Sequence, residues 1–165
     1  MLSKSLITFF IILTNFFLHY AYSDDQINFD VSQIEVLEGG NKIIGKKRGT
    51  IKTNDGVIIN ADEFEYDKIK NILKAKGNIT VNDEANDYII NSENILYLKN
   101  QEKIQIKGKS SSLIFSNFNF KSEDLIILRD ELVLESNKPT TIIDKKNQTL
   151  YEIDKFSYSI KEEIL

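Results

Sequence analysis

Cysteine and tryptophan are absent from this 165-residue chain, and histidine and proline each occur once. Without cysteine the chain forms no disulfides, so its stability depends on apolar burial and main-chain hydrogen bonding. The single histidine, His19, lies in an N-terminal segment that we expect to be removed. The remaining chain then lacks Ser–His and Cys–His nucleophiles and the imidazole or thiolate ligands of many metal sites, so we expect no metal and no cofactor.

A strong charge of one sign is also missing. The chain has 21 basic and 25 acidic residues, a formal net charge of −4, and the two signs are well mixed along it. Proteins that bind nucleic acid present a basic field to the phosphates. We therefore expect no nucleic-acid partner.

The N-terminal segment has the pattern of a secretory signal peptide. Lys4 precedes the apolar run LITFFIILTNFFL, and the small residues Ala21 and Ser23 follow. This pattern predicts a signal peptide at residues 1–23 and a single mature domain at residues 24–165. The alternative is an uncleaved anchor, but the uninterrupted apolar run is shorter than the ~20 residues that span a bilayer.

Alternation of apolar and polar residues dominates the mature chain. In ILKAKGNITV (72–81), Leu73, Ala75, Ile79 and Val81 fall on one face, and mostly lysine, asparagine and threonine fall on the other. Successive side chains of a strand point to opposite faces of a sheet. This pattern predicts half-buried β-strands and an all-β fold.

A two-strand unit recurs at a spacing of about 31 residues. One unit is INADEFEYDKIKNILKAKGNITV (59–81). A weaker copy follows as INSENILYLKNQEKIQIKGKS (90–110), and each matching residue lies 31 positions further along the chain. Five first strands can be found, but the pattern of the second strand is clear in the first three units alone. The fourth unit is degenerate and contains Pro139, which predicts an edge or a loop there. Because two strands cannot bury their own apolar face, we expect the units to stack.

The first strand of each unit changes phase at one point. The apolar spacing slips from two residues to three at Asp62–Glu63, between Ala61 and Phe64. One extra residue in a strand is a β-bulge, which bends the strand and increases its twist. A bend at the same point of every unit predicts a curved antiparallel sheet, folded so that its apolar faces oppose.

Acidic residues recur at these bends. Asp62, Glu63 and Glu65 mark one bend and Glu93 marks the next. An acid at every bend is better explained as a solvated corner than as one active site. We therefore expect that the protein is not an enzyme.

The apolar face is the candidate binding surface. Its members are expected to point inward as a continuous stripe, and they are Ile59, Ala61, Phe64, Tyr66, Leu73, Ala75, Ile79, Val81, Ile90, Ile95, Tyr97, Ile104 and Ile106. One interpretation is a fully packed core, and the other is a trough that stays open and binds lipid acyl chains. The periodicity of the stripe does not decide between them, and a one-residue slip of register would exchange the two faces.

These units resemble the OstA-like repeat of the lipopolysaccharide transport proteins. That repeat runs apolar–x–Ala–Asp–x–apolar–x–Tyr–Asp, then a spacer, then Ala–x–Gly–Asn–Val. Residues 57–83 match it closely, residues 88–110 moderately, and residues 29–53 and 151–165 loosely, whereas residues 111–150 match least. The resemblance implies a curved antiparallel β-jellyroll domain in the periplasm, associated with the outer membrane of a Gram-negative envelope.

The resemblance also implies a transport role without chemistry. Domains of this family join end to end by strand addition into a bridge between the membranes, and lipopolysaccharide moves along it with its acyl chains in the apolar trough. The implied partners are lipopolysaccharide, other β-jellyroll proteins of the transport system and the outer-membrane translocon. The final unit stops at FSYSIKEEIL in mid-unit. A soluble bridge protein and the N-terminal portion of a translocon both remain open.

Interpretations from other classes are also open. An exported, repetitive β-chain can be a structural module of an adhesin or filament, with the same stripe sealed in a closed core and no lipid bound. An enzyme that acts on envelope glycans with carboxylates is a third candidate, and it requires two acids that converge in a cleft. The interior distinguishes the first two, since a groove open to lipid differs from a sealed core.

Overall fold

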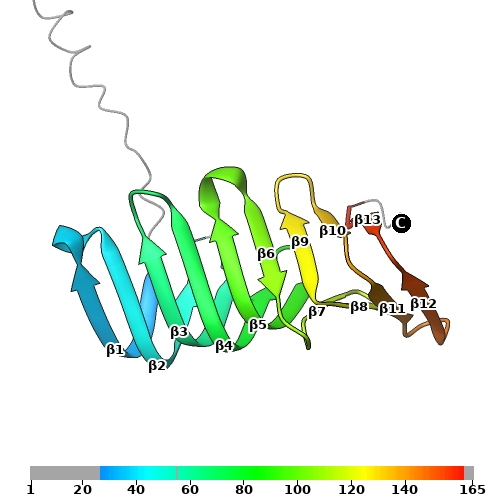
Figure 1. Ribbon diagram of the computed structural model, residues 1–165, viewed down its shortest axis with the longest axis horizontal. Helices are drawn as coiled ribbons and strands as arrows, with labels where there is room; N and C mark the ends of the chain where they lie inside the picture. The colour runs from blue at the N-terminus through cyan, green and yellow to red at the C-terminus, as the bar shows by residue number, and fades with distance from the viewer. Residues whose placement is uncertain (1–26, 55, 162–165) are drawn as a thin grey trace, which may run out of the picture.

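The computed structural model describes residues 27–54 and 56–161, and the strands of this part of the chain stack side by side along its length (Figure 1). The expected signal peptide lies outside the described residues. The strands are β1 (Asn28–Leu37), β2 (Lys42–Lys52), β3 (Ile58–Asp67), β4 (Ile72–Asp83), β5 (Tyr88–Leu98), β6 (Lys103–Lys107), β7 (Ser112–Phe115), β8 (Phe118–Ser122), β9 (Asp124–Leu128), β10 (Val133–Ser136), β11 (Thr140–Asp144), β12 (Thr149–Ile153) and β13 (Phe156–Ser159).

Every pair of adjacent strands is antiparallel, as the alternating pattern predicts. The strands belong to one sheet that forks into two paths. Layer A contains one half of each strand from β1 to β5, followed by β6–β9–β10–β13. Layer B contains the other half of each strand from β1 to β5, followed by β7–β8–β11–β12. The first five strands are long enough to cross both layers, and the later strands are split between them. The fold is therefore a bent, open β-jellyroll.

The bend occurs where the sequence changes phase. The register between β3 and β4 shifts between Asn60 and Glu63, and similar shifts interrupt the pairings of β1 with β2, β2 with β3 and β4 with β5. Bulges at matching positions in neighbouring strands bend the whole sheet along one line. We call this line the crease. The bend lies at the predicted phase change, but the prediction that β3 carries the extra residue at Asp62–Glu63 is wrong. Two residues of β3 face three residues of β4 there, so the extra residue belongs to β4, and β2 carries the extra residue in its pairings with β1 and β3.

Glycine and an acidic residue pack together at the crease. Gly77 has φ +77°, and a Cβ added to it would lie 2.6 Å from Asp62 Oδ2. Asn78 Nδ2 donates to Asp62 at 2.7 Å, and Arg48 Nη1 donates to the same carboxylate at 3.1 Å. The recurring acid is therefore a structural partner of the bend, which agrees with the expectation of a corner and not with that of an acid–base pair.

Buried hydroxyls occupy the crease in the later units. Ser92 Oγ lies 3.0 Å from Ser111 Oγ, and Ser122 Oγ lies 3.2 Å from Ser136 Oγ. All four serines are buried. A buried hydroxyl is costly unless it is hydrogen-bonded, so these pairs satisfy polar groups where the regular ladder stops.

The fourth unit folds although its sequence pattern is degenerate. β8 and β9 form its first half, and β10 and β11 form its second half. Pro139 lies between β10 and β11, outside both ladders, as predicted for a residue that cannot donate a main-chain hydrogen bond. The proline thus marks the crease of this unit and does not end the array.

Substitution of Gly77 tests the geometry of the crease. We expect Gly77→Ala to lower the free energy of unfolding by about 1–3 kcal/mol, because alanine disfavours this backbone conformation and its Cβ displaces Asp62. Chemical denaturation measures the loss. Gly39→Ala is the matched control, since Gly39 has φ +63° and open space around it. Equal losses in the two variants would show that the contact with Asp62 contributes nothing.

Candidate functional site in the apolar interior

The predicted inward-facing residues lie where the sequence places them. All thirteen are buried, with exposed fractions from 0% to 7%. They come from β3, β4, β5 and β6 and belong to one apolar cluster between the two layers. The predicted inner face of these strands is therefore confirmed, and the binding of lipid by these residues stays a prediction.

Strand pairing joins the inward side chains into continuous rows. Each row crosses all nine strands of its layer. The row in layer B consists of Phe29, Ile51, Ile59, Val81, Ile90, Leu113, Phe120, Ile142 and Tyr151. The row in layer A consists of Val36, Ile43, Tyr66, Leu73, Tyr97, Ile104, Ile127, Leu134 and Tyr158. We call them row B and row A.

The space between the rows is filled by the side chains themselves. A slot of about 20 Å³ lies between Ile59 and Val81 of layer B and Tyr97 and Ile104 of layer A. A cavity of this size holds about one water molecule. The interior between the rows is therefore a packed core.

The two ends of the rows differ. Row A ends at β1 on Val36, which is 58% exposed, and Ile34 of the same strand is also exposed. At the opposite end three aromatic rings pack across the layers. The centroid of the Phe120 ring lies 5.5 Å from that of Phe156 and 5.1 Å from that of Tyr158. Row A is therefore uncovered at β1 and covered by aromatic rings at β13, whereas row B ends at β12 on Tyr151, which is 42% exposed.

A polar cluster lies at the free edge of the layers, opposite the crease. Arg129 follows β9 in layer A, and its Nη1 donates to Glu102 Oε2 at 2.9 Å and to the Tyr97 hydroxyl at 3.0 Å. Its Nη2 lies 3.6 Å from Asp83 Oδ2, at the end of β4 in layer B. No local sequence pattern predicts this cluster, because its members are far apart in the chain and no repeat links them.

Tyr88 and Tyr97, the two tyrosines beside Arg129, have raised pKa values. Burial raises the pKa of Tyr88, and the nearby Asp83 carboxylate raises it further. Burial also raises the pKa of Tyr97, and its hydrogen bond to Glu102 adds to the effect. Both phenols are therefore neutral at physiological pH, and the Tyr97 hydroxyl is hydrogen-bonded to Glu102 and Arg129 at the edge of the apolar interior.

The outer face of layer A carries ion pairs. Glu65 Oε1 lies 3.1 Å from Lys74 Nζ and 3.2 Å from Lys42 Nζ, and the hydrogen bond from Lys74 is the main cause of the lowered pKa of Glu65. Glu35 pairs with Lys46 in the same way. Exposed pairs of this kind stabilise a protein by about 0–1 kcal/mol each. This face is a solvated surface whose charges largely compensate one another.

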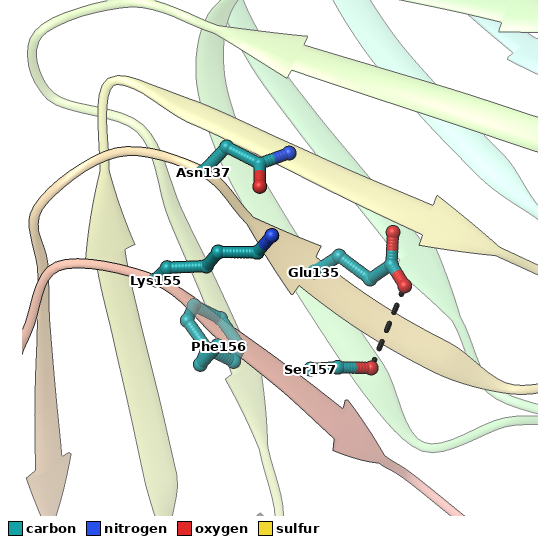
Figure 2. Close-up of a pocket in the computed structure, with 5 residues that line it drawn as sticks. All are labelled: Glu135, Asn137, Lys155, Phe156 and Ser157. Carbon is teal, nitrogen blue, oxygen red and sulfur yellow. Dashed lines mark hydrogen bonds between the residues drawn. The ribbon is translucent and has the colours of Figure 1, made fainter.

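A polar hollow of about 480 Å³ lies at the far end of the molecule, lined by Glu135, Asn137, Lys155, Phe156 and Ser157. Figure 2 shows Glu135 and Ser157 joined by a hydrogen bond of 3.5 Å, with Asn137 and Lys155 on the neighbouring segments. Glycosidase chemistry requires two carboxyl groups across a cleft, and this lining contributes one. The hollow does not supply the converging acids that an enzyme of that kind would need.

The fold and the interior define a class of protein, the bent antiparallel β-jellyroll with apolar rows between its layers. No family model and no curated protein matches the sequence. Among solved structures the fold is similar to LptH from Pseudomonas aeruginosa, described as the LptA-homologous periplasmic component of the conserved lipopolysaccharide transport device. The match has a TM-score of 0.55 and 10% sequence identity, and it covers 77% of this chain and 81% of LptH. At this identity the likeness shows a shared fold.

None of the helical segments in the described part of the chain has the length and apolarity needed to cross a membrane.

Alkaline unfolding tests the polar edge of the interior. A tyrosine in the unfolded chain loses its proton near its ordinary pKa of 10.0, whereas Tyr88 and Tyr97 keep theirs when folded. Above this pH the unfolded state binds fewer protons, so the free energy of unfolding falls as pH rises. Denaturation midpoints measured from about pH 8 to pH 11 should show this fall, and it should be shallower in Tyr97→Phe. An identical slope in that variant would contradict the assignment.

Proposed function

We propose that the protein is a periplasmic component of lipopolysaccharide transport that shelters acyl chains between layers A and B. The observation that carries the proposal is the pair of apolar rows, each unbroken across nine strands. The fold shared with LptH and the resemblance of residues 57–83 to the OstA-like repeat support the same role. In this proposal the protein supplies a path for lipid and performs no chemistry on it.

The geometry of the rows suits a path better than a single pocket. Nine strands at a spacing of about 4.8 Å give a row roughly 38 Å long. Burial of an acyl chain contributes about 0.8 kcal/mol per methylene group. Similar aliphatic side chains recur along most of each row. An acyl chain that moves from one strand to the next therefore replaces its contacts with similar ones and meets no deep free-energy minimum.

The packed interior sets a condition on this role. The slot of about 20 Å³ is far too small for an acyl chain, so layers A and B must separate along their free edge while they stay joined at the crease. The register shifts in the long strands already interrupt the ladders at the crease. We propose that lipid enters through the free edge and that the crease acts as the hinge.

The partners follow from the two uncovered ends of the sheet. Within residues 27–54 and 56–161, β1 pairs with β2 alone, and Ile34, Val36 and Leu37 of β1 are exposed, so a further strand could add there and extend row A. β12 and β13 form the other end of the described sheet, each with one neighbour. We propose end-to-end addition of other β-jellyroll proteins of the transport system, with the outer-membrane translocon as the destination. A soluble bridge protein and a translocon N-terminal portion both fit.

The packed interior also favours a second candidate, a structural β-repeat module of an adhesin or filament. Such a module needs no opening, and the close packing of the rows around the small slot is what it requires. The two candidates differ in one property, since a structural module never admits lipid between its layers.

Crosslinking to lipid separates the two candidates. A photo-crosslinking amino acid replaces Phe64, which is buried in the interior, in one sample and the outward-facing Glu65 in another, and each protein is mixed with lipopolysaccharide. We expect crosslinks at position 64 and none at position 65, because acyl chains contact the inner face alone. The same strand carries both positions, so each sample controls the other.

Crosslinked lipid is detected as a band shift with an antibody against lipopolysaccharide, and circular dichroism verifies the fold of both samples. A folded protein that crosslinks at neither position would support the structural module. Equal crosslinking at both positions would show that lipid contact is not confined to the inner face, and would contradict the proposal.

A further inference from the structure

An ion pair connects the two layers at their free edge. Asp83 is the last residue of β4 in layer B, and Arg129 follows β9 in layer A. The side chain of Asp83 is 1% exposed and that of Arg129 is 13% exposed. The contact between them therefore crosses the edge through which, in the proposed function, an acyl chain would pass.

Several contacts hold Arg129 to its own layer, and they are shorter than its contact with Asp83 across the edge. Its guanidinium donates to Glu102 at 2.9 Å and to the Tyr97 hydroxyl at 3.0 Å, and it lies 5.6 Å from the centre of the Tyr97 ring. Its main-chain N–H donates to the Glu102 carbonyl at 2.8 Å. The contact with Asp83 in layer B, at 3.6 Å, is longer than any of its hydrogen bonds in layer A.

Asp83 has partners of its own in layer B. Its carboxylate accepts hydrogen bonds from the Asn86 main-chain N–H at 3.1 Å and from Asn86 Nδ2 at 2.9 Å. If the layers separate, the Arg129–Asp83 contact breaks while each charge keeps its remaining partners. A buried charge left without a partner is very costly, so this arrangement lets the edge open without that cost.

The ion pair lies beside the apolar slot. Arg129 lines the slot together with Val57, Ile59 and Val81 from the side of layer B and with Tyr97 from layer A. The walls of the slot come from rows A and B, so separation of the layers would widen the slot into the interior.

We propose that the Arg129–Asp83 pair is a latch that holds the free edge closed over the slot, and that its release admits one lipid acyl chain from the side. The inference rests on the proposed function, because it assigns to this site the step by which a chain enters. Arg129 remains with layer A and Asp83 with layer B in both states.

The charges of the cluster argue against a different use, the binding of an anionic headgroup. Arg129 faces two carboxylates, Asp83 and Glu102. A third anion would meet a cation that is already compensated, with like charges beside it. The ligand at this site is therefore the apolar chain.

The absence of cysteine from the chain permits a direct test. Val81→Cys places a single thiol in the wall of the slot, and its rate of reaction with a maleimide measures opening of the edge without any lipid. The protein is expressed from the full-length chain and carries either Asp83→Asn or Glu102→Gln as a second substitution. Each substitution replaces a carboxylate that contacts the Arg129 guanidinium with a neutral amide. Asp83 lies across the edge from Arg129, and Glu102 lies in the same layer as Arg129.

We expect Asp83→Asn to accelerate labelling about tenfold, the factor that corresponds to ~1.4 kcal/mol, and Glu102→Gln to leave the rate within about twofold of the parent. Asn86→Ala controls for the hydrogen bonds that Asp83 makes within layer B, and it should also leave the rate unchanged. Circular dichroism compares the fold of all variants. Equal acceleration in Asp83→Asn and Glu102→Gln, or in Asp83→Asn and Asn86→Ala, would overturn the latch, as would no acceleration in any variant.

A second readout separates the latch from the proposed function. Binding of the fluorescent fatty acid cis-parinaric acid is measured with the same variants, and tighter binding by Asp83→Asn alone is expected. Faster labelling of Asp83→Asn without any fatty-acid binding would support the latch as a device that opens the edge, and would contradict acyl-chain sheltering. Fatty-acid binding that is equal in all variants, together with equal labelling, would leave the sheltering intact and overturn the latch.

Discussion

Burial of one apolar face between two halves of the same strands is the constraint on which this structure depends. A two-strand unit has nothing to cover its apolar face, and a flat sheet of such units would leave the whole face in water. The bend at the crease brings the two halves of each long strand over one another, so the sheet covers itself. The bulges, the glycine at position 77 and the buried serine pairs all serve this bend.

The same constraint determines where function is possible. The crease joins the layers covalently and the free edge does not, so the interior can become accessible along one side while the strands stay paired. The ends of row A are unequal, because Val36 of β1 is exposed whereas aromatic rings cover the row near β13. In the proposed function, a strand added at β1 would continue row A into a neighbouring protein, and a series of such domains would form one path.

The local features of this fold could be predicted from the sequence, and the contacts between layers could not. The alternation in residues 72–81 and the phase change at Asp62–Glu63 are short-range patterns, and they correctly predict the buried face and the position of the bend, although the extra residue lies on β4 and not on β3. The contact of Asp83 with Arg129 depends on how two layers meet, and neither residue differs in its local pattern from the other charged residues near the turns. The filled interior was also beyond prediction, because periodicity tells which side chains point inward but not how closely the layers approach.

The most direct test of entry between the layers is the distance between them with and without lipid. Cysteines are introduced at the outward-facing positions Gln105 of layer A and Ile89 of layer B, and each carries a spin label. These labels leave the interior unchanged, and pulsed electron paramagnetic resonance measures the distance between them. If acyl chains enter between the layers, lipopolysaccharide should shift the distribution of separations to longer distances. An unchanged distribution in the presence of bound lipopolysaccharide would contradict sheltering in the interior and would place the lipid on the outer surface.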